Sequence, residues 1–183
     1  MKDMTWEIVS SEHLFNRPWL TVRRDVVRLP DGRINPEFYV LEYPDWVNVI
    51  AVTEDRQMVM IRQYRHGIRQ TCFELCAGVA EQGETMEEAA RRELLEETGF
   101  GGGTFTEIMT ISANASTTSN LTHCFLATGV RPIGDRHLDP TEDIEVHLLP
   151  QPEVLRMLSS GSFLQATMVA PLWKYFYDES LPF

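Results

Sequence analysis

The chain has 183 residues, 43% of them hydrophobic, so it can bury a full core and is predicted to form one domain with at most a small extra module. A formal net charge of -11 argues against nucleic acid or an anionic membrane as a partner, because following phosphates usually requires a basic patch. The opening MKDMTWE leads into no apolar signal segment, and no apolar run approaches the ~18 residues that span a bilayer, so we predict a cytoplasmic protein.

The first elements in chain order indicate a small antiparallel β module. Two β-rich runs at 20–29 and 37–43 flank the Pro-Asp-Gly turn of LPDGR. Pro44 and Asp45 then interrupt the pattern. We therefore predict an N-terminal β module over residues 1–44 and a main domain over residues 45–183.

The main domain begins with a second predicted hairpin, WVNVIAVT at 46–53 and MVMIRQYR at 58–65, whose continuous apolar character indicates a buried sheet. The Gly-rich stretch GFGGG at 99–103 is interpreted as a flexible exit from a helix. Later strands are predicted at 123–130 and 144–150, and helices at 152–161 and 163–176, the second disturbed by Pro171. The predicted fold class is α+β.

A helix with recognisable ends is predicted between Thr85 and Gly99. Thr85 followed by Glu88 fits a capping box, and Gly99 suits a left-handed C-terminal cap. Ala89, Ala90 and Leu94 give the helix an apolar stripe that packs on the core.

Three glutamates lie beside this apolar stripe. At ~100° per residue, Glu93, Glu96 and Glu97 fall within an arc of roughly 100°, so their carboxylates point the same way. Clustered hard oxygen ligands suit Mg²⁺ or Mn²⁺, and Arg92, four residues before Glu96, can hold one carboxylate in place. The alternative is a solvated charged helix face.

The spacing of the fixed residues decides between these interpretations. The Nudix box has the pattern G-x5-E-x7-R-E-U-x-E-E-x-G-U, with U aliphatic or aromatic. Every fixed position is present, as Gly78, Glu84, Arg92, Glu93, Leu94, Glu96, Glu97, Gly99 and Phe100. The chain therefore resembles the Nudix hydrolases, which hydrolyse a nucleoside diphosphate linked to another group with the help of divalent metal. The resemblance implies an α/β/α sandwich with a mixed sheet.

Further segments resemble the ADP-ribose and nucleotide-sugar pyrophosphatase branch of that family. They are RQYRHG at 62–67, FELCAG at 73–78, EDIEVHLLP at 142–150 and the N-terminal β module. The resemblance implies that the Ala77 carbonyl joins Glu93 and Glu97 as metal ligands. It also implies that Glu96 and Glu74 are further metal ligands, or that they contact the metal ligands or the substrate.

Two departures from the branch pattern concern loops. Cys76 stands where the branch commonly has proline before the box. Ala115, in SANASTTSN at 112–120, stands where we place a second proline, in a loop that bears on substrate choice. The reaction is therefore better defined than the substrate. Cys72, Cys76 and Cys124 lack a zinc spacing and are interpreted as buried hydrophobes in a reducing compartment.

Hydrolysis also needs a group that accepts a proton from the attacking water. By resemblance this acid lies in the loop DPTED at 139–143, and we choose Glu142, with Asp139 and Glu145 as alternatives. Each of these acids is otherwise an exposed loop or edge-strand residue.

Arginines and tryptophans are the candidates for substrate contact. Arg62, Arg65 and Arg69 lie at the end of a strand and in its exit loop, where a guanidinium can hold phosphate oxygens. Trp46 and Trp19 can stack on a base, although aromatic residues in β structure more often belong to the core.

The leading functional hypothesis is Mg²⁺- or Mn²⁺-dependent hydrolysis of ADP-ribose to AMP and ribose 5-phosphate. Another nucleotide sugar, NADH or a nucleoside triphosphate are alternative substrates, and a nucleotide-sensing module without catalysis is an alternative class. Resemblance to the branch also implies a homodimer in which the β module contacts the partner subunit.

Overall fold

The computed structural model describes residues 1–180. The chain forms two compact units: residues 1–44 together with 112–121 make the first, and the remaining residues make the second. Within the described part of the chain, no helix combines the length and apolar character that crossing a bilayer requires.

The first unit is a three-stranded antiparallel sheet in the order β1 (Glu7–Arg17), β2 (Leu20–Arg28), β3 (Ile34–Glu42). Residues 112–121 join it through Leu41, whose backbone bonds Thr117 and Ser119 at 2.7 and 3.0 Å. The two predicted runs correspond to β2 and β3. Strand β1 was not predicted, because all its residues are exposed and its sequence shows no alternation between a buried and a solvated face.

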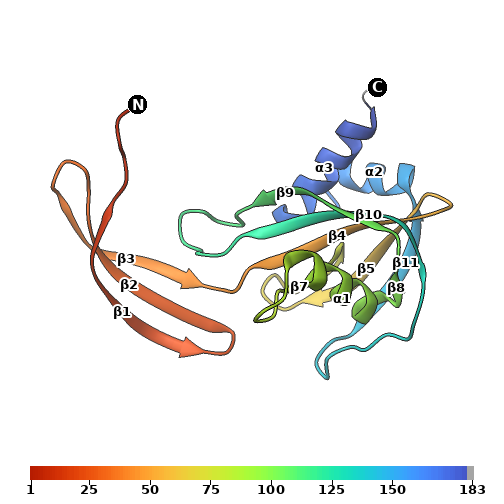
Figure 1. Cartoon of the computed structure of the whole chain (residues 1–183), viewed down its shortest axis with the longest axis horizontal. Helices are drawn as coiled ribbons and strands as arrows, with labels where there is room; N and C mark the ends of the chain where they lie inside the picture. The colour runs from red at the N-terminus through yellow and green to blue at the C-terminus, as the bar shows by residue number, and fades with distance from the viewer. Residues whose placement is uncertain (181–183) are drawn as a thin grey trace. The chain divides into compact units, whose positions relative to one another are not determined.

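The second unit is built on a mixed sheet flanked by helices (Figure 1). The central strands β4 and β10 are parallel, and every other pairing in the sheet is antiparallel. Strand β4 pairs with β5 at one end and with β7 at the other. The elements of this unit are β4 (Trp46–Thr53), β5 (Gln57–Arg65), β6 (Gln70–Glu74), β7 (Cys76–Val79), α1 (Met86–Thr98), β8 (Phe100–Gly101), β9 (Thr104–Ile111), β10 (Thr122–Pro132), β11 (Ile144–Pro150), α2 (Gln151–Ser159) and α3 (Ala166–Ser180).

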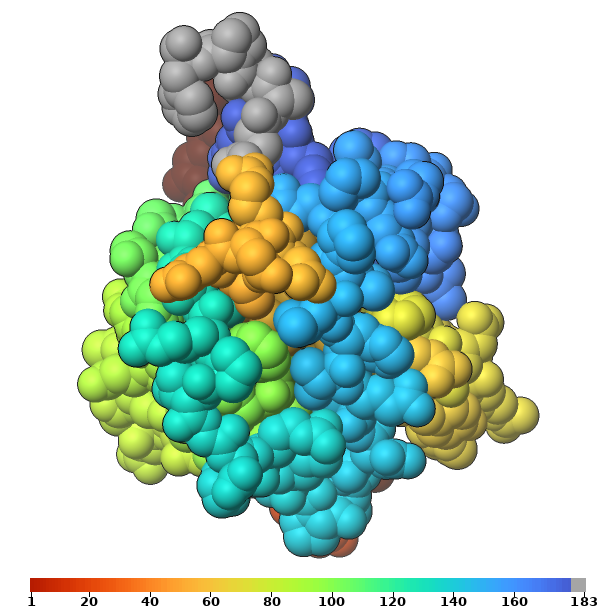
Figure 2. Space-filling model, turned by 90° about the vertical axis from the view of Figure 1, so that its right-hand side faces the viewer, coloured from red at the N-terminus to blue at the C-terminus, as the bar shows by residue number. Residues whose placement is uncertain are grey.

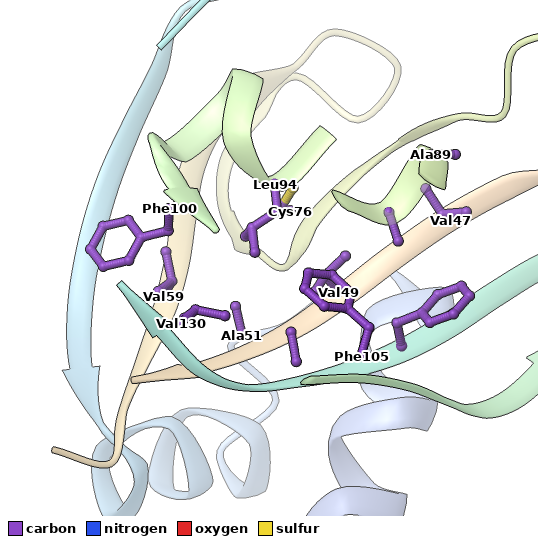
Figure 3. Close-up of a cluster of buried hydrophobic side chains, with 13 residues drawn as sticks. Val47, Val49, Ala51, Val59, Cys76, Ala89, Leu94, Phe100, Phe105 and Val130 are labelled. Carbon is purple, nitrogen blue, oxygen red and sulfur yellow. The ribbon is translucent and has the colours of Figure 1, made fainter. Parts of the chain in front are cut away.

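Helices cover both faces of this sheet, and each face has its own apolar cluster. On one face, Val47 and Val49 of β4 pack with Ala89, Ala90 and Leu94 of α1 (Figure 3). On the other face, alternate residues of β4 pack against α2 and α3. The α+β prediction is confirmed, and α1 is held at the sheet by the apolar stripe predicted for it.

The most strongly patterned elements match their predicted bounds, whereas several other strands were missed. The predictions at 46–53 and 144–150 coincide with β4 and β11. Strands β6, β7 and β9 were not predicted. The interpretation of residues 99–103 as a flexible exit was wrong, since Phe100 and Gly101 form β8 against β10.

The helix around Pro171 runs on without a break, from Ala166 to Ser180. Proline has no N–H, so the carbonyl four residues earlier, that of Thr167, loses its helical donor. The side chain of Asn48 replaces it, with Nδ2 donating to the Thr167 carbonyl at 2.7 Å. A buried amide on the sheet thus compensates for the proline.

Candidate active site

Helix α1 has both of its predicted ends. The Thr85 side chain accepts from the Glu88 backbone N–H at 3.2 Å, and the Glu88 carboxylate accepts from the Thr85 N–H at 2.8 Å, which completes the capping box. Gly99 has φ 75° and its N–H donates to the Leu95 carbonyl. These caps fix the residues at which the helix starts and ends. They therefore also fix which side of the helix carries the glutamates.

Arg92 connects the loop before α1 with two of the glutamates. Its guanidinium donates to Glu84 at 2.7 and 2.9 Å, to Glu93 at 2.9 Å, to Glu96 at 3.0 Å and to the Val79 carbonyl at 2.9 Å. The hydrogen bond from Arg92 lowers the pKa of Glu84. The sequence predicted only the contact with one carboxylate; the bond to Glu84 spans eight residues and has no local signal.

Glu97 is the most deeply buried of the box glutamates, with 3% of its surface exposed. Its Oε2 accepts from the Ala77 backbone N–H at 3.1 Å. Burial raises its pKa to about 8, against the opposing hydrogen bonds from Cys76 and Ala77. Burial also raises the pKa of Glu93, against the opposing hydrogen bond from Arg92. In both residues burial therefore disfavours the charged carboxylate by more than the protein's hydrogen bonds favour it.

Gly78 allows the Glu93 carboxyl to lie directly against the β7 backbone. A Cβ placed on Gly78 would overlap the carbon and both oxygens of that carboxyl group. The first residue of the box is therefore glycine because a carboxylate occupies the space of its side chain. The sequence showed this glycine only as a fixed position of the motif.

The buried carboxylate predicts a pH dependence for the metal-free protein. The pKa of Glu97, about 8 when folded, lies above its usual 4.5, so the folded chain binds this proton more tightly than the unfolded chain does. The free energy of unfolding should therefore fall from about pH 5 to pH 8, by on the order of a few kcal/mol. Urea titrations in EDTA should show this fall for the wild type and a smaller one for Glu97→Gln; equal slopes would contradict the assignment.

The donor set fits a hard divalent cation. The Glu97 carboxylate accepts from the Ala77 N–H, and the Glu93 carboxyl lies against Gly78. Glu96 shares Arg92 with Glu93, so three hard oxygen donors are presented on neighbouring turns of α1 and beside β7. As they stand, Glu93 and Glu96 are turned to Arg92. Among residues 1–180 no three acidic, His or Cys side chains are gathered as a ready-made metal site. Metal binding thus requires exchange of the bonds to Arg92.

The candidate base lies in the exposed loop between β10 and β11 (Figure 2, cyan). Glu142 closes a turn there, accepting from the Asp139 N–H at 2.9 Å. Its charge adds to the effect of burial in raising the pKa of both Glu93 and Glu97. Glu145 instead pairs with Arg62 at 2.8 Å.

The two arginines of β5 lie in different surroundings. Arg62 forms an exposed cross-strand ion pair with Glu145 and has no contact with the box. Arg65 donates to the buried Glu74 at 2.9 and 2.5 Å, and the charge of Glu97 is among the groups that raise its pKa after Glu74 itself. The structure thus brings Arg65 and Glu74 to the acidic cluster. Arg69 lies in the following turn with φ 54°.

Trp46 and Trp19 belong to different units of the structure. Trp46 lines a cavity of about 240 Å³ together with Arg65, Ala77 and Gly78. Trp19 belongs to the first unit and is 81% exposed.

All three cysteines are free and buried, as predicted. Burial raises the pKa of Cys124 to about 11 and that of Cys76 well above its usual value. Neither thiol is therefore activated as a nucleophile.

Comparisons with known proteins cover nearly the whole chain. The family model of the NUDIX domain matches residues 43–169, and that of the nucleoside diphosphate sugar hydrolase N-terminal domain matches residues 6–41. The chain is 29% identical to the "ADP-ribose pyrophosphatase" of Bacillus subtilis (strain 168) over 167 residues, which are 91% of this chain and 90% of that protein.

A second relative and a solved structure also match most of the chain. The "ADP-ribose pyrophosphatase" of Mycobacterium tuberculosis (strain ATCC 25618 / H37Rv) is 29% identical over 172 residues, 93% of this chain and 83% of that protein. A structure described as "Crystal structure of ADP compounds hydrolase" matches with a TM-score of 0.84 at 22% identity, over 98% of this chain and 99% of the other. It shows that the two chains share a fold.

Proposed function

The chain belongs to the Nudix family, and from this premise we propose that it hydrolyses the pyrophosphate bond of a nucleoside diphosphate linked to a sugar, with ADP-ribose as the leading substrate. The products are AMP and ribose 5-phosphate. The observation that carries the proposal is the complete box folded as one cluster, with Glu97 buried at the Ala77 N–H and the Glu93 carboxyl against Gly78. The match to a nucleoside diphosphate sugar hydrolase module and the names of the two relatives support this substrate class.

The cofactor is Mg²⁺ or Mn²⁺, held by Glu93, Glu96, Glu97 and the Ala77 carbonyl. When bound, the metal neutralises charge on the phosphate oxygens and lowers the pKa of coordinated water. Without metal, Arg92 holds Glu93 and Glu96, which would exchange it for the cation, whereas Glu97 is held by the Ala77 N–H. The chain thereby positions its ligands at the end of a rigid helix rather than on a loop.

Arg65 is the better placed of the two strand arginines for holding the diphosphate. It lines the cavity beside Ala77 and Gly78, and its pairing with the buried Glu74 fixes the guanidinium there. Arg62, which is committed to Glu145 on the surface, is the weaker candidate. Trp46 lies on the same cavity as Arg65 and is the proposed aromatic contact.

Glu142 is proposed to accept the proton of the attacking water, because its charge contributes to raising the pKa of both Glu93 and Glu97. Glu142→Gln should lower turnover by about 10²- to 10⁴-fold with little change in metal affinity. Steady-state rates and a Mn²⁺ titration measure the two effects. Asp135→Asn in the same exposed loop is the matched control. A wild-type rate for Glu142→Gln would move the role to Asp139 or Glu145.

The reaction is tested by measuring product release from ADP-ribose, other nucleotide sugars, NADH and nucleoside triphosphates, with Mg²⁺ or Mn²⁺ and again with EDTA. We expect EDTA-sensitive cleavage of ADP-ribose to AMP. Preference for a triphosphate would overturn the substrate class. Cleavage of nothing in the panel, with a nucleotide sugar still raising the melting temperature, would favour a sensing module instead.

We also propose that the first unit contacts a second copy of the chain. Its strand β1 is exposed along its whole length, and Ile8, Phe15 and Trp19 are 57%, 58% and 81% exposed. Sedimentation equilibrium should give a dimer mass; a monomer mass at all concentrations would remove this proposal. A cytoplasmic location stays a prediction, supported by three free cysteines in the described part of the chain.

A further inference from the structure

The loop between β10 and β11, residues 133–143 (cyan in Figure 1), is fastened at its start to the end of α1. The Ile133 N–H donates to the Gly99 carbonyl at 3.0 Å, and the His137 N–H donates to the Glu96 carbonyl at 2.9 Å. The Glu96 carbonyl belongs to the last turn of α1, where helical donors run out. The loop therefore begins by completing the helix that carries the proposed metal ligands.

Gly99 makes this close approach possible. A Cβ on Gly99 would lie 2.8 Å from the Gly134 carbonyl oxygen and 3.6 Å from Cγ of Arg136. Because the nearer of these atoms is backbone, a side chain at position 99 would push the loop off the helix. Glycine at this fixed position of the box thus serves the loop as well as the helix cap.

The far end of the loop is joined to its start by the side chain of Arg136. Its Nη1 donates to the Ile144 carbonyl at 2.8 Å. Ile144 is the first residue of β11, is 4% exposed and is paired with Gln63 of β5. The loop has to pass β4 and β5 to reach it, because the sheet order is β11-β5-β4-β10. Arg136 therefore closes the loop onto a buried strand end, and residues 137–143 form the tip beyond that closure.

Glu142 lies in this tip. Its backbone N–H donates to the Asp139 carbonyl at 2.9 Å, and its Oε2 accepts from the Asp139 N–H at 2.9 Å. Both bonds stay within the tip, so they shape the turn without fixing where the turn lies. The place of the turn is set by the bonds at the base of the loop.

We propose that Arg136 is a positioning residue of the hydrolysis, whose bond to Ile144 holds the loop closed so that Glu142 reaches the water that attacks the diphosphate. This inference rests on the proposed function and deepens it. The guanidinium ends on a backbone carbonyl, so the role acts through Glu142 and not through contact with substrate. The loss of one such hydrogen bond changes an equilibrium by roughly fivefold to tenfold.

The first experiment measures the loop itself, without metal or substrate. A glutamate-specific protease is added in EDTA to the wild type, Arg136→Met, Arg136→Lys and the control Arg131→Met, an exposed arginine near the end of β10. Methionine removes the donors, whereas lysine keeps the charge and can still donate to a carbonyl. We expect cleavage after Glu142 to be about fivefold faster in Arg136→Met than in the other three proteins, because a loop must open to be cut. Equal cleavage of all four would overturn the closure.

The second experiment asks whether the closure acts through Glu142. The kcat and KM for ADP-ribose and the Mn²⁺ affinity are measured for Arg136→Met, Glu142→Gln and the double variant. We expect Arg136→Met to lower kcat about fivefold to tenfold with KM and Mn²⁺ affinity unchanged, and Arg136→Lys to restore most of the loss. In the Glu142→Gln background the same change should have no further effect, since a displaced glutamine has no proton acceptor to lose.

The outcomes separate the positioning role from the proposed function. An equal loss in both backgrounds, or a wild-type kcat for Arg136→Met, would overturn the role even where ADP-ribose is cleaved. A wild-type rate for Glu142→Gln would overturn it as well, because the base would lie elsewhere. Absence of hydrolysis by the wild type, with faster cleavage of Arg136→Met after Glu142, would instead count against the proposed function and support the closure.

Discussion

Glu97→Gln is expected to lower metal-dependent hydrolysis by roughly 10³-fold or more while the protein stays folded. Glutamine has nearly the same size and keeps an oxygen that can accept from the Ala77 N–H, so the local hydrogen bond survives. What it removes is the buried negative charge that attracts the cation. Initial rates with saturating Mg²⁺ and circular dichroism of the same samples measure activity and fold.

The control for this variant is Glu87→Gln on the same helix. Glu87 is exposed and pairs with Arg91, away from the cluster, so its loss should leave the rate within about twofold. Near-normal turnover of folded Glu97→Gln would show that the residue is not a metal ligand. A higher stability of that variant in EDTA at pH 8 would connect its lost activity to the same buried charge.

Gly78→Ala is expected to lower turnover by about 10²-fold with only a small change in stability. The new methyl group would overlap the Glu93 carboxyl, so that carboxyl must move away from β7. Displacement of a catalytic group by about 1 Å costs on the order of 10² in rate. Because the displaced atoms are the end of a flexible side chain, the sheet and helix need not shift.

Gly67→Ala is the matched control, because a Cβ at that position meets no atom within 4 Å. The two alanine variants should differ in rate but have similar melting temperatures. A large loss of stability in Gly78→Ala would mean that the backbone gives way instead of Glu93. Wild-type turnover would show that the position of Glu93 does not matter.

Local signals in the sequence predicted the parts of this molecule that depend on near neighbours. The capping box and Gly99 defined α1 because both ends are satisfied within a few residues. The continuous apolar run 46–53 predicted β4 for a similar reason. In contrast, β7 has only four residues and exists through its pairing with β4, which no local pattern encodes.

In the site, too, some features follow from local sequence patterns and others depend on the whole fold. The motif gave the glutamates, but the raised pKa values of Glu93 and Glu97 arise from burial, which depends on the whole fold. Arg62 and Arg65 could have been separated from sequence, since residues three apart on a strand point to opposite faces. The amide of Asn48 and its acceptor are 119 residues apart, so that contact lay beyond any local pattern.

The replacement of a helical donor by the Asn48 amide has a consequence for how related sequences can change. If position 171 gained a residue with an N–H, the Thr167 carbonyl could be satisfied inside α3, and Asn48 would lose the acceptor that orients it. A relative without proline there has no structural reason to keep an amide at position 48. The two positions are therefore expected to covary across homologues.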